Sequence, residues 1–216
     1  MALIAYHNDP ALKQHRITTM RQHREAEKLI KGTYQDNDGR GCAVGCLIGS
    51  GDHMQYESRF GIPAQIAYLE DKIFEGLPMK DALLWPERFL SAIPVGADLM
   101  PAFRAFMARL MDDPQGGVIR FARTPEERKI ITDVADLYRE NCTDKNRWAA
   151  SAASAASAAS AASAAWAASA ASAAWAAWAA SAASAASAAS AASAAYQWQA
   201  DTLIECLEAL TETISP

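Results

Sequence analysis

The amino-acid sequence predicts an all-α protein in which a compact multi-helix domain is followed by a very long Ala/Ser/Trp-rich helix and an amphipathic C-terminal helix. Helix caps and helical spacing of apolar residues mark the first part, and an uncharged alanine tract marks the second. The only strand candidate, Val118–Phe121, is short. We therefore expect a helical domain at residues 1–147, a low-complexity helix at 148–196 and a terminal helix at 197–216.

Several helices in residues 1–147 are expected to begin at a proline or at a capping residue that a proline follows. Apolar residues three and four positions apart continue each pattern, and a glycine ends two of the helices. The expected helices run from Asp9-Pro10 to Gly32, from Pro63 to Gly76, from Pro86 through Ile93, over residues 97–112, and from Thr124 through Tyr138. The Thr124-Pro125-Glu126-Glu127 sequence is typical of a capping box.

The alanine tract, residues 148–195, consists of sixteen triplets that start with serine or tryptophan and end in two alanines. Alanine is the best helix former, so we expect an α-helix. A period of three does not match the 3.6 residues of a helical turn, so the serine positions wind around the helix instead of forming one face. Expansion of a nine-base DNA repeat would give the same period, and the sequence leaves both origins open.

Aromatic residues in the triplet register predict an interface; they are Trp148, Trp166, Trp175, Trp178 and Tyr196. They point to several sides of an uncharged helix, which would be poorly soluble unless covered. The cover is the front domain, a second copy of the chain, or the tract folded back on itself. Because small side chains let helices approach closely, we expect a homo-oligomer. We do not expect a membrane span, because alanine and serine contribute little hydrophobicity.

Charge and cysteine content exclude other classes of protein. The net charge is −5, and every lysine and arginine precedes residue 148, so a nucleic-acid partner is not expected. Met1–Ala5 is too short for the apolar core of a secretory signal, since polar residues follow at once. Four cysteines without an export signal indicate reduced thiols. We therefore expect a cytoplasmic protein without a membrane partner.

The Gly/Cys-rich segment at residues 35–53 is the strongest candidate for chemistry. One hypothesis is a cysteine-dependent enzyme in which Cys42 opens a short helix whose positive end lowers the thiol pKa. His53 or His23 would then act as the base and Asp52 would orient it. The alternative is that Cys42 and Cys46 are small core residues on one helical face.

A second hypothesis for this loop is a pocket for a small anionic ligand such as a nucleotide. Its candidate ligand-binding residues are His7, His23, Arg40 and Cys46. A third is a zinc site made of Cys42, Cys46 and one or two of these histidines or His53. Because Cys-x3-Cys has no second matched pair, this signal is weak, and the sequence predicts no metal and no cofactor.

The sequence does not define the function. The leading hypothesis is a non-enzymatic interaction or scaffold protein that self-associates through its Ala/Ser-rich helix. The alternatives are a protein that binds a small anionic ligand and a cysteine-dependent enzyme that uses the Gly/Cys-rich segment.

Overall fold

A computed structural model describes residues 3–152 and 185–214, and the secondary structure of these residues is helical without a strand. The all-α class predicted from the sequence is therefore confirmed for this part of the chain. The chain divides into two compact units, one formed by Met1–Phe103 with Ala200–Pro216 and the other by Arg104–Gln199. No helix in the described ranges is long and apolar enough to cross a membrane.

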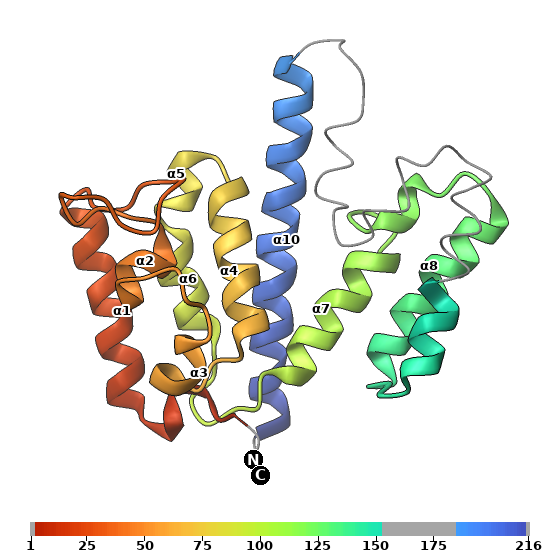
Figure 1. Ribbon diagram of the computed structural model, residues 1–216, viewed down its shortest axis with the longest axis horizontal. Helices are drawn as coiled ribbons and strands as arrows, with labels where there is room; N and C mark the ends of the chain where they lie inside the picture. Colours follow the sequence, from red (N-terminus) through yellow and green to blue (C-terminus); the bar gives the residue numbers. More distant parts are fainter. Residues whose placement is uncertain (1–2, 153–184, 215–216) are drawn as a thin grey trace. The chain divides into compact units, whose positions relative to one another are not determined.

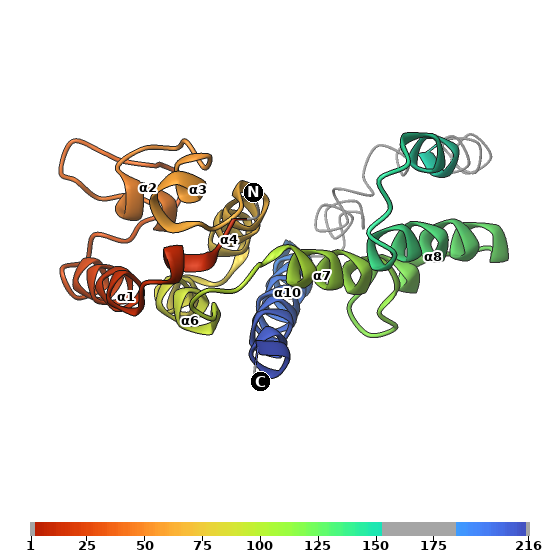
Figure 2. The ribbon, with the colours of Figure 1, turned by 90° about the horizontal axis from the view of Figure 1, so that it is seen from below.

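The first unit is a bundle of short helices with the C-terminal part of a long one. Its elements are η1 (Ala5–Asn8), α1 (Pro10–Glu25), α2 (Ala43–Ile48), α3 (Gln55–Phe60), α4 (Ala64–Gly76), α5 (Met79–Ala82), α6 (Trp85–Ala92) and the end of α10 (Ala185–Ile214). Helix α1 packs against α2 and α6, and α4 packs against α2, α3 and α6 (Figure 1). The view from below shows α1 and α6 side by side (Figure 2). Buried aromatic rings fill the core, among them Tyr6, Tyr56, Phe60, Phe74, Trp85 and Phe89.

The second unit is also helical. It contains most of α7 (Met100–Asp112), η2 (Val118–Phe121), α8 (Pro125–Arg139), helical residues 145–152 and the start of α10. The predicted capping box is confirmed, because the Thr124 and Glu127 side chains each bond the other's backbone N–H. The short segment considered as a strand candidate, Val118–Phe121, is not a strand but a 3₁₀ turn, and Val118 packs against the cluster of Ala108, Met111 and Ala135.

The expected first helix ends earlier than its sequence pattern indicates. Helix α1 stops at Glu25, not at Gly32, because Glu27 adopts a left-handed conformation with φ 54°. The chain then leaves the helix, and Leu29 pairs with Gly41 in an isolated β-bridge. By contrast, the helix expected from Pro63 to Gly76 is confirmed as α4.

The long C-terminal helix joins two of the predicted segments, because α10 continues without a break past residue 196. At the other end of the tract, Trp148 forms a T-shaped ring pair with Tyr138 and donates from Nε1 to the Cys142 carbonyl at 2.9 Å. Tyr196 is half-buried. The remaining interface residues, Trp166, Trp175 and Trp178, lie outside the described residues, so self-association through the tract stays a prediction.

Glycines allow the chain at Tyr34 to pass directly over the start of α2. A Cβ atom at Gly41 or Gly45 would overlap the backbone carbonyl of Tyr34, and one at Gly51 would overlap its ring. The backbone N–H of Cys42 donates to the Thr33 carbonyl at 2.8 Å, which fixes the loop to the helix. This close approach places Cys42 at the N-cap position of α2.

We expect Gly45→Ala to destabilise the protein by roughly 1–3 kcal/mol, because the added methyl meets a backbone carbonyl that cannot rotate away. In a solvent-exposed helix the same change would stabilise the protein, so the sign of the change in unfolding free energy tests the packing. Denaturant unfolding measures it. Gly51→Ala is the control and should cost less, since the atoms nearest its added methyl belong to the ring of Tyr34, an exposed side chain that can move aside. A Gly45→Ala protein as stable as the wild type would contradict this packing.

Candidate functional site

Cys42 begins α2 and is almost completely enclosed. Its side chain is 1% exposed, and its sulfur accepts a hydrogen bond from the backbone N–H of Gly45 at 3.5 Å. The expected short helix at Cys42 is therefore confirmed. The expected lowering of its thiol pKa is wrong: burial raises the pKa of Cys42 to about 12, and the carboxylates of Asp71 and Glu70 add to the effect. Burial outweighs the hydrogen bond from the helix start.

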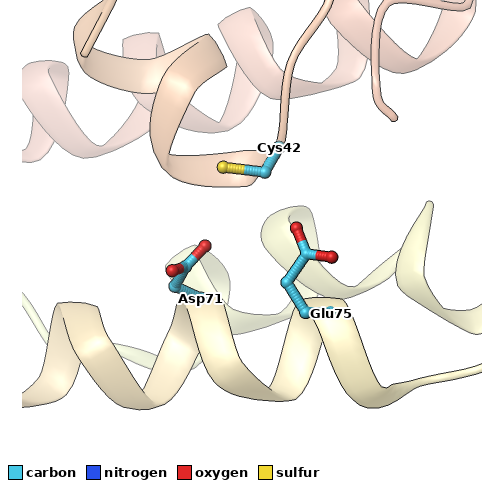
Figure 3. A group of neighbouring side chains, drawn as sticks. All are labelled: Cys42, Asp71 and Glu75. Carbon is cyan, nitrogen blue, oxygen red and sulfur yellow. The ribbon is translucent and has the colours of Figure 1, made fainter. Parts of the chain in front are cut away.

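Helix α4 presents two carboxylates to this sulfur. Asp71 and Glu75 are one helical turn apart, so their side chains share a face. Figure 3 shows both carboxylates pointing toward the Cys42 thiol, which comes from the start of α2. One donor atom from each residue lies within 4.8 Å of the other two. We call these three residues the Cys42 cluster.

The two oxygens of Asp71 have different surroundings. Oδ2 lies 3.2 Å from Nε2 of His53, and this histidine is only 2% exposed. Oδ1 is buried and has no hydrogen-bond partner among the described residues. The Asp71 side chain is 8% exposed, so water does not readily replace the missing partner. A buried carboxylate oxygen in this condition costs desolvation free energy unless a proton or a cation reaches it.

Glu75 forms the more open side of the cluster and is half-buried. The backbone N–H of Gly32 donates to both of its carboxylate oxygens at 3.1 Å. Lys31 donates from Nζ to the backbone carbonyls of Glu75 and Leu77, which holds the loop against the end of α4. Burial raises the pKa of Glu75. The carboxylate is thus oriented by its loop before any ligand arrives.

The donor set suits a small divalent ion. Zinc binds cysteine sulfur and carboxylate oxygen at roughly 2.0–2.3 Å, which puts neighbouring donors of a tetrahedral shell about 3.5 Å apart. The donors here lie within 4.8 Å of one another, so side-chain rotations that move the donor atoms by about an ångström would close the shell. Metal binding would require Cys42 to lose its proton, since the thiolate is the ligand.

A second buried carboxylate lies beside the cluster. Glu70 is fully buried, and its Oε2 accepts a hydrogen bond from the Tyr56 hydroxyl at 3.4 Å. Its Oε1 is buried and has no hydrogen-bond partner within the described residues. Burial raises the pKa of Glu70 well above its ordinary value, and the charge of Asp71 raises it further. The folded protein therefore favours the protonated form of Glu70.

The candidate catalytic pair is arranged differently from a nucleophile and its base. In a cysteine–histidine site the imidazole contacts the sulfur directly. Here the hydrogen-bond partner of the His53 imidazole is Asp71, which also belongs to the Cys42 cluster. His53 also stacks on Tyr68 at 4.0 Å between ring centroids. Cys42 and His53 thus both lie next to Asp71. This arrangement favours a site centred on the Asp71 carboxylate.

The predicted anion-binding residues have separate partners. Nε2 of His7 lies 3.1 Å from the Ser58 carbonyl oxygen, and Arg40 pairs with Asp36 at 2.8 Å within its own loop. The Cys46 sulfur lies 3.5 Å from the Gly41 carbonyl oxygen, and burial raises its pKa to about 11. Burial lowers the pKa of His23, in the last turn of α1. Binding of a small anion by these residues stays a prediction.

Sequence reasoning missed Asp71 and Glu75. Their spacing of four residues on an expected helix is a real signal, but such pairs are common on solvated faces. Nothing in the local sequence indicates that this face of α4 turns toward Cys42. No protein-family model, curated protein or solved structure matches this chain, so the site is defined by its own geometry.

We expect Glu70→Gln to stabilise the protein increasingly as the pH rises. The unfolded chain ionises Glu70 near its ordinary pKa of 4.5, whereas the folded protein holds the proton to higher pH. Wild-type stability therefore falls as the pH rises from the unfolded pKa toward the folded pKa, by about 1.4 kcal/mol for each unit that separates the two values. Glutamine does not titrate and avoids this loss.

Thermal unfolding from pH 4 to pH 8 in the presence of a chelator measures the effect. The melting temperature of the variant should exceed that of the wild type by a margin that grows with pH. A constant difference across this range would show that burial of Glu70 does not displace its titration.

Proposed function

We propose that this protein binds a divalent transition-metal ion, with the Cys42 cluster as the binding site. The observation that carries the proposal is the convergence of three donor atoms within 4.8 Å, one of them from a carboxylate with a buried, unpartnered oxygen. A cation would satisfy that oxygen and compensate for the burial of two carboxylates and a thiolate. The function is therefore metal binding in a helical protein.

The donor chemistry favours a borderline or soft ion over a hard one. Magnesium and calcium prefer shells made of oxygen, whereas a cysteine sulfur favours ions such as zinc. The half-buried Glu75 provides a side from which an ion can enter, while Cys42 and Asp71 are enclosed. Zinc or a similar ion is the expected occupant.

This function is better supported than a cysteine nucleophile. A nucleophile needs a thiolate at neutral pH, and burial raises the pKa of Cys42 to about 12 in the absence of an ion. A bound metal ion removes this difficulty, since coordination itself displaces the thiol proton. The same burial that disfavours a free thiolate thus favours a metal-bound one.

We expect Cys42→Ser to weaken Co²⁺ binding by more than about 100-fold, which exceeds the 10–100-fold effect of losing a group that only supports a ligand. Titration of the chelator-treated full chain with Co²⁺, followed by absorption spectroscopy, measures the affinity. Thiolate-to-cobalt charge transfer in the near ultraviolet reports sulfur ligation. The wild type should develop this band and the variant should lack it.

Cys46→Ser is the matched control, because Cys46 lies in the same helix but its sulfur faces the Lys28 and Gly41 carbonyls. It should retain both the affinity and the charge-transfer band. Absence of Co²⁺ and Zn²⁺ binding to the wild type, or an unchanged band in Cys42→Ser, would overturn the proposed function.

A further inference from the structure

The imidazole of His53 is held in one orientation by its surroundings. It stacks on Tyr68 with an angle of 18° between the ring planes, and it forms a T-shaped pair with Tyr34 at 5.9 Å between centroids. It is buried, and its Nε2 lies 3.2 Å from Oδ2 of Asp71. A metal-binding Asp71 is ionised and its carboxylate only accepts, so in the metal-bound protein Nε2 carries the proton and donates it.

This hydrogen bond makes the two oxygens of Asp71 inequivalent. Oδ2 is engaged by His53, and Oδ1 is buried without a partner among the described residues. Rotation of the carboxylate to offer both oxygens to one ion would break the bond to His53. While this bond to His53 holds, Oδ1 is the Asp71 oxygen without a hydrogen bond among the described residues.

We propose that His53 is a positioning residue that restricts Asp71 to coordination through Oδ1 and thereby selects a compact, four-coordinate metal shell. The inference rests on the proposed metal-binding function. Hydrogen bonds to the far side of a ligand fix its orientation and are worth about 10–100-fold in metal affinity. Single-oxygen coordination by Asp71, together with the Cys42 sulfur, matches the small tetrahedral shell of zinc and cobalt.

The same restriction disfavours calcium and magnesium. Calcium takes six to eight oxygen ligands and often uses both oxygens of a carboxylate, and magnesium requires an octahedron of oxygens. Three protein donors and one water fill a tetrahedral shell, whereas the sulfur donor and the single oxygen of Asp71 suit neither of these two oxygen-preferring ions. Glu75 is restrained as well, because the N–H of Gly32 lies 3.1 Å from each of its carboxylate oxygens.

Two substitutions of His53 separate the effect of its hydrogen bond to Asp71 from the effect of its aromatic ring. His53→Phe keeps an aromatic ring for stacking on Tyr68 and removes the donor, whereas His53→Gln removes the ring and keeps an N–H near the position of Nε2. The full chain is titrated with Co²⁺ alone and then with Co²⁺ in the presence of millimolar Mg²⁺ or Ca²⁺. Affinity is read from the charge-transfer band, and geometry from the intensity of the visible ligand-field bands.

We expect His53→Phe to weaken Co²⁺ binding by about 10–100-fold and to lower the tetrahedral band intensity. His53→Gln should retain most of the affinity and the wild-type spectrum. Neither Mg²⁺ nor Ca²⁺ should displace Co²⁺ from the wild type. If His53→Phe binds Co²⁺ like the wild type, or if Ca²⁺ displaces it, the inference fails while the metal-binding function stands. If the wild type binds neither Co²⁺ nor Zn²⁺, the proposed function itself fails.

A measurement on the unmodified protein provides a test that does not depend on the folding of a variant. A long-range ¹H–¹⁵N spectrum of the zinc-loaded wild type reports the protonation of each imidazole nitrogen. We expect Nε2 of His53 to keep its proton, as a donor to Asp71 must. A zinc-bound or unprotonated Nε2 would overturn the positioning role.

Discussion

The packing of α4 against α2 imposes the central constraint on this molecule, because it turns carboxylates inward. Glu70 and Asp71 are buried, and Glu75 is half-buried at the end of the same helix. Taking carboxylates out of water is costly unless they gain hydrogen bonds, protons or a counter-ion. Tyr56, His53 and Gly32 supply one partner each, yet one oxygen of Glu70 and one of Asp71 remain unsatisfied within the described residues.

The loop before α2 determines what these carboxylates face. Glycines at 41 and 45 let the backbone of Tyr34 lie directly on the first turn of α2, and the loop then brings the N–H of Gly32 to Glu75. Cys42 is thereby placed opposite α4 with its thiol enclosed. The glycines of this segment allow the close packing, and Cys42 lies where the start of α2 faces Asp71 and Glu75.

Local features of the fold could be predicted from the sequence, because local chemistry determines them. The capping box at Thr124, the helix from Pro63 to Gly76 and the short helix opened by Cys42 all follow from residues that interact with near neighbours. The end of α1 could not be predicted, since a left-handed Glu27 breaks the helix before its glycine. Glycine at position 32 looked like the stronger signal, but it belongs to the loop that binds Glu75.

The site could be predicted only in part, for a related reason. Cys42 and His53 stand out in a Gly-rich segment, but Asp71 resembles any acidic residue of an amphipathic helix. Its role depends on which face of α4 is buried, and that is decided by packing between segments about thirty residues apart. The thiol pKa was misjudged for the same reason, since burial of Cys42 is a tertiary property.

The most direct test of the account is anomalous diffraction at the zinc absorption edge from crystals of the zinc-loaded protein. We expect one strong anomalous peak bonded to the sulfur of Cys42, to Oδ1 of Asp71 and to a carboxylate oxygen of Glu75. A peak at other residues, or no ordered zinc in protein that diffracts well, would contradict the account.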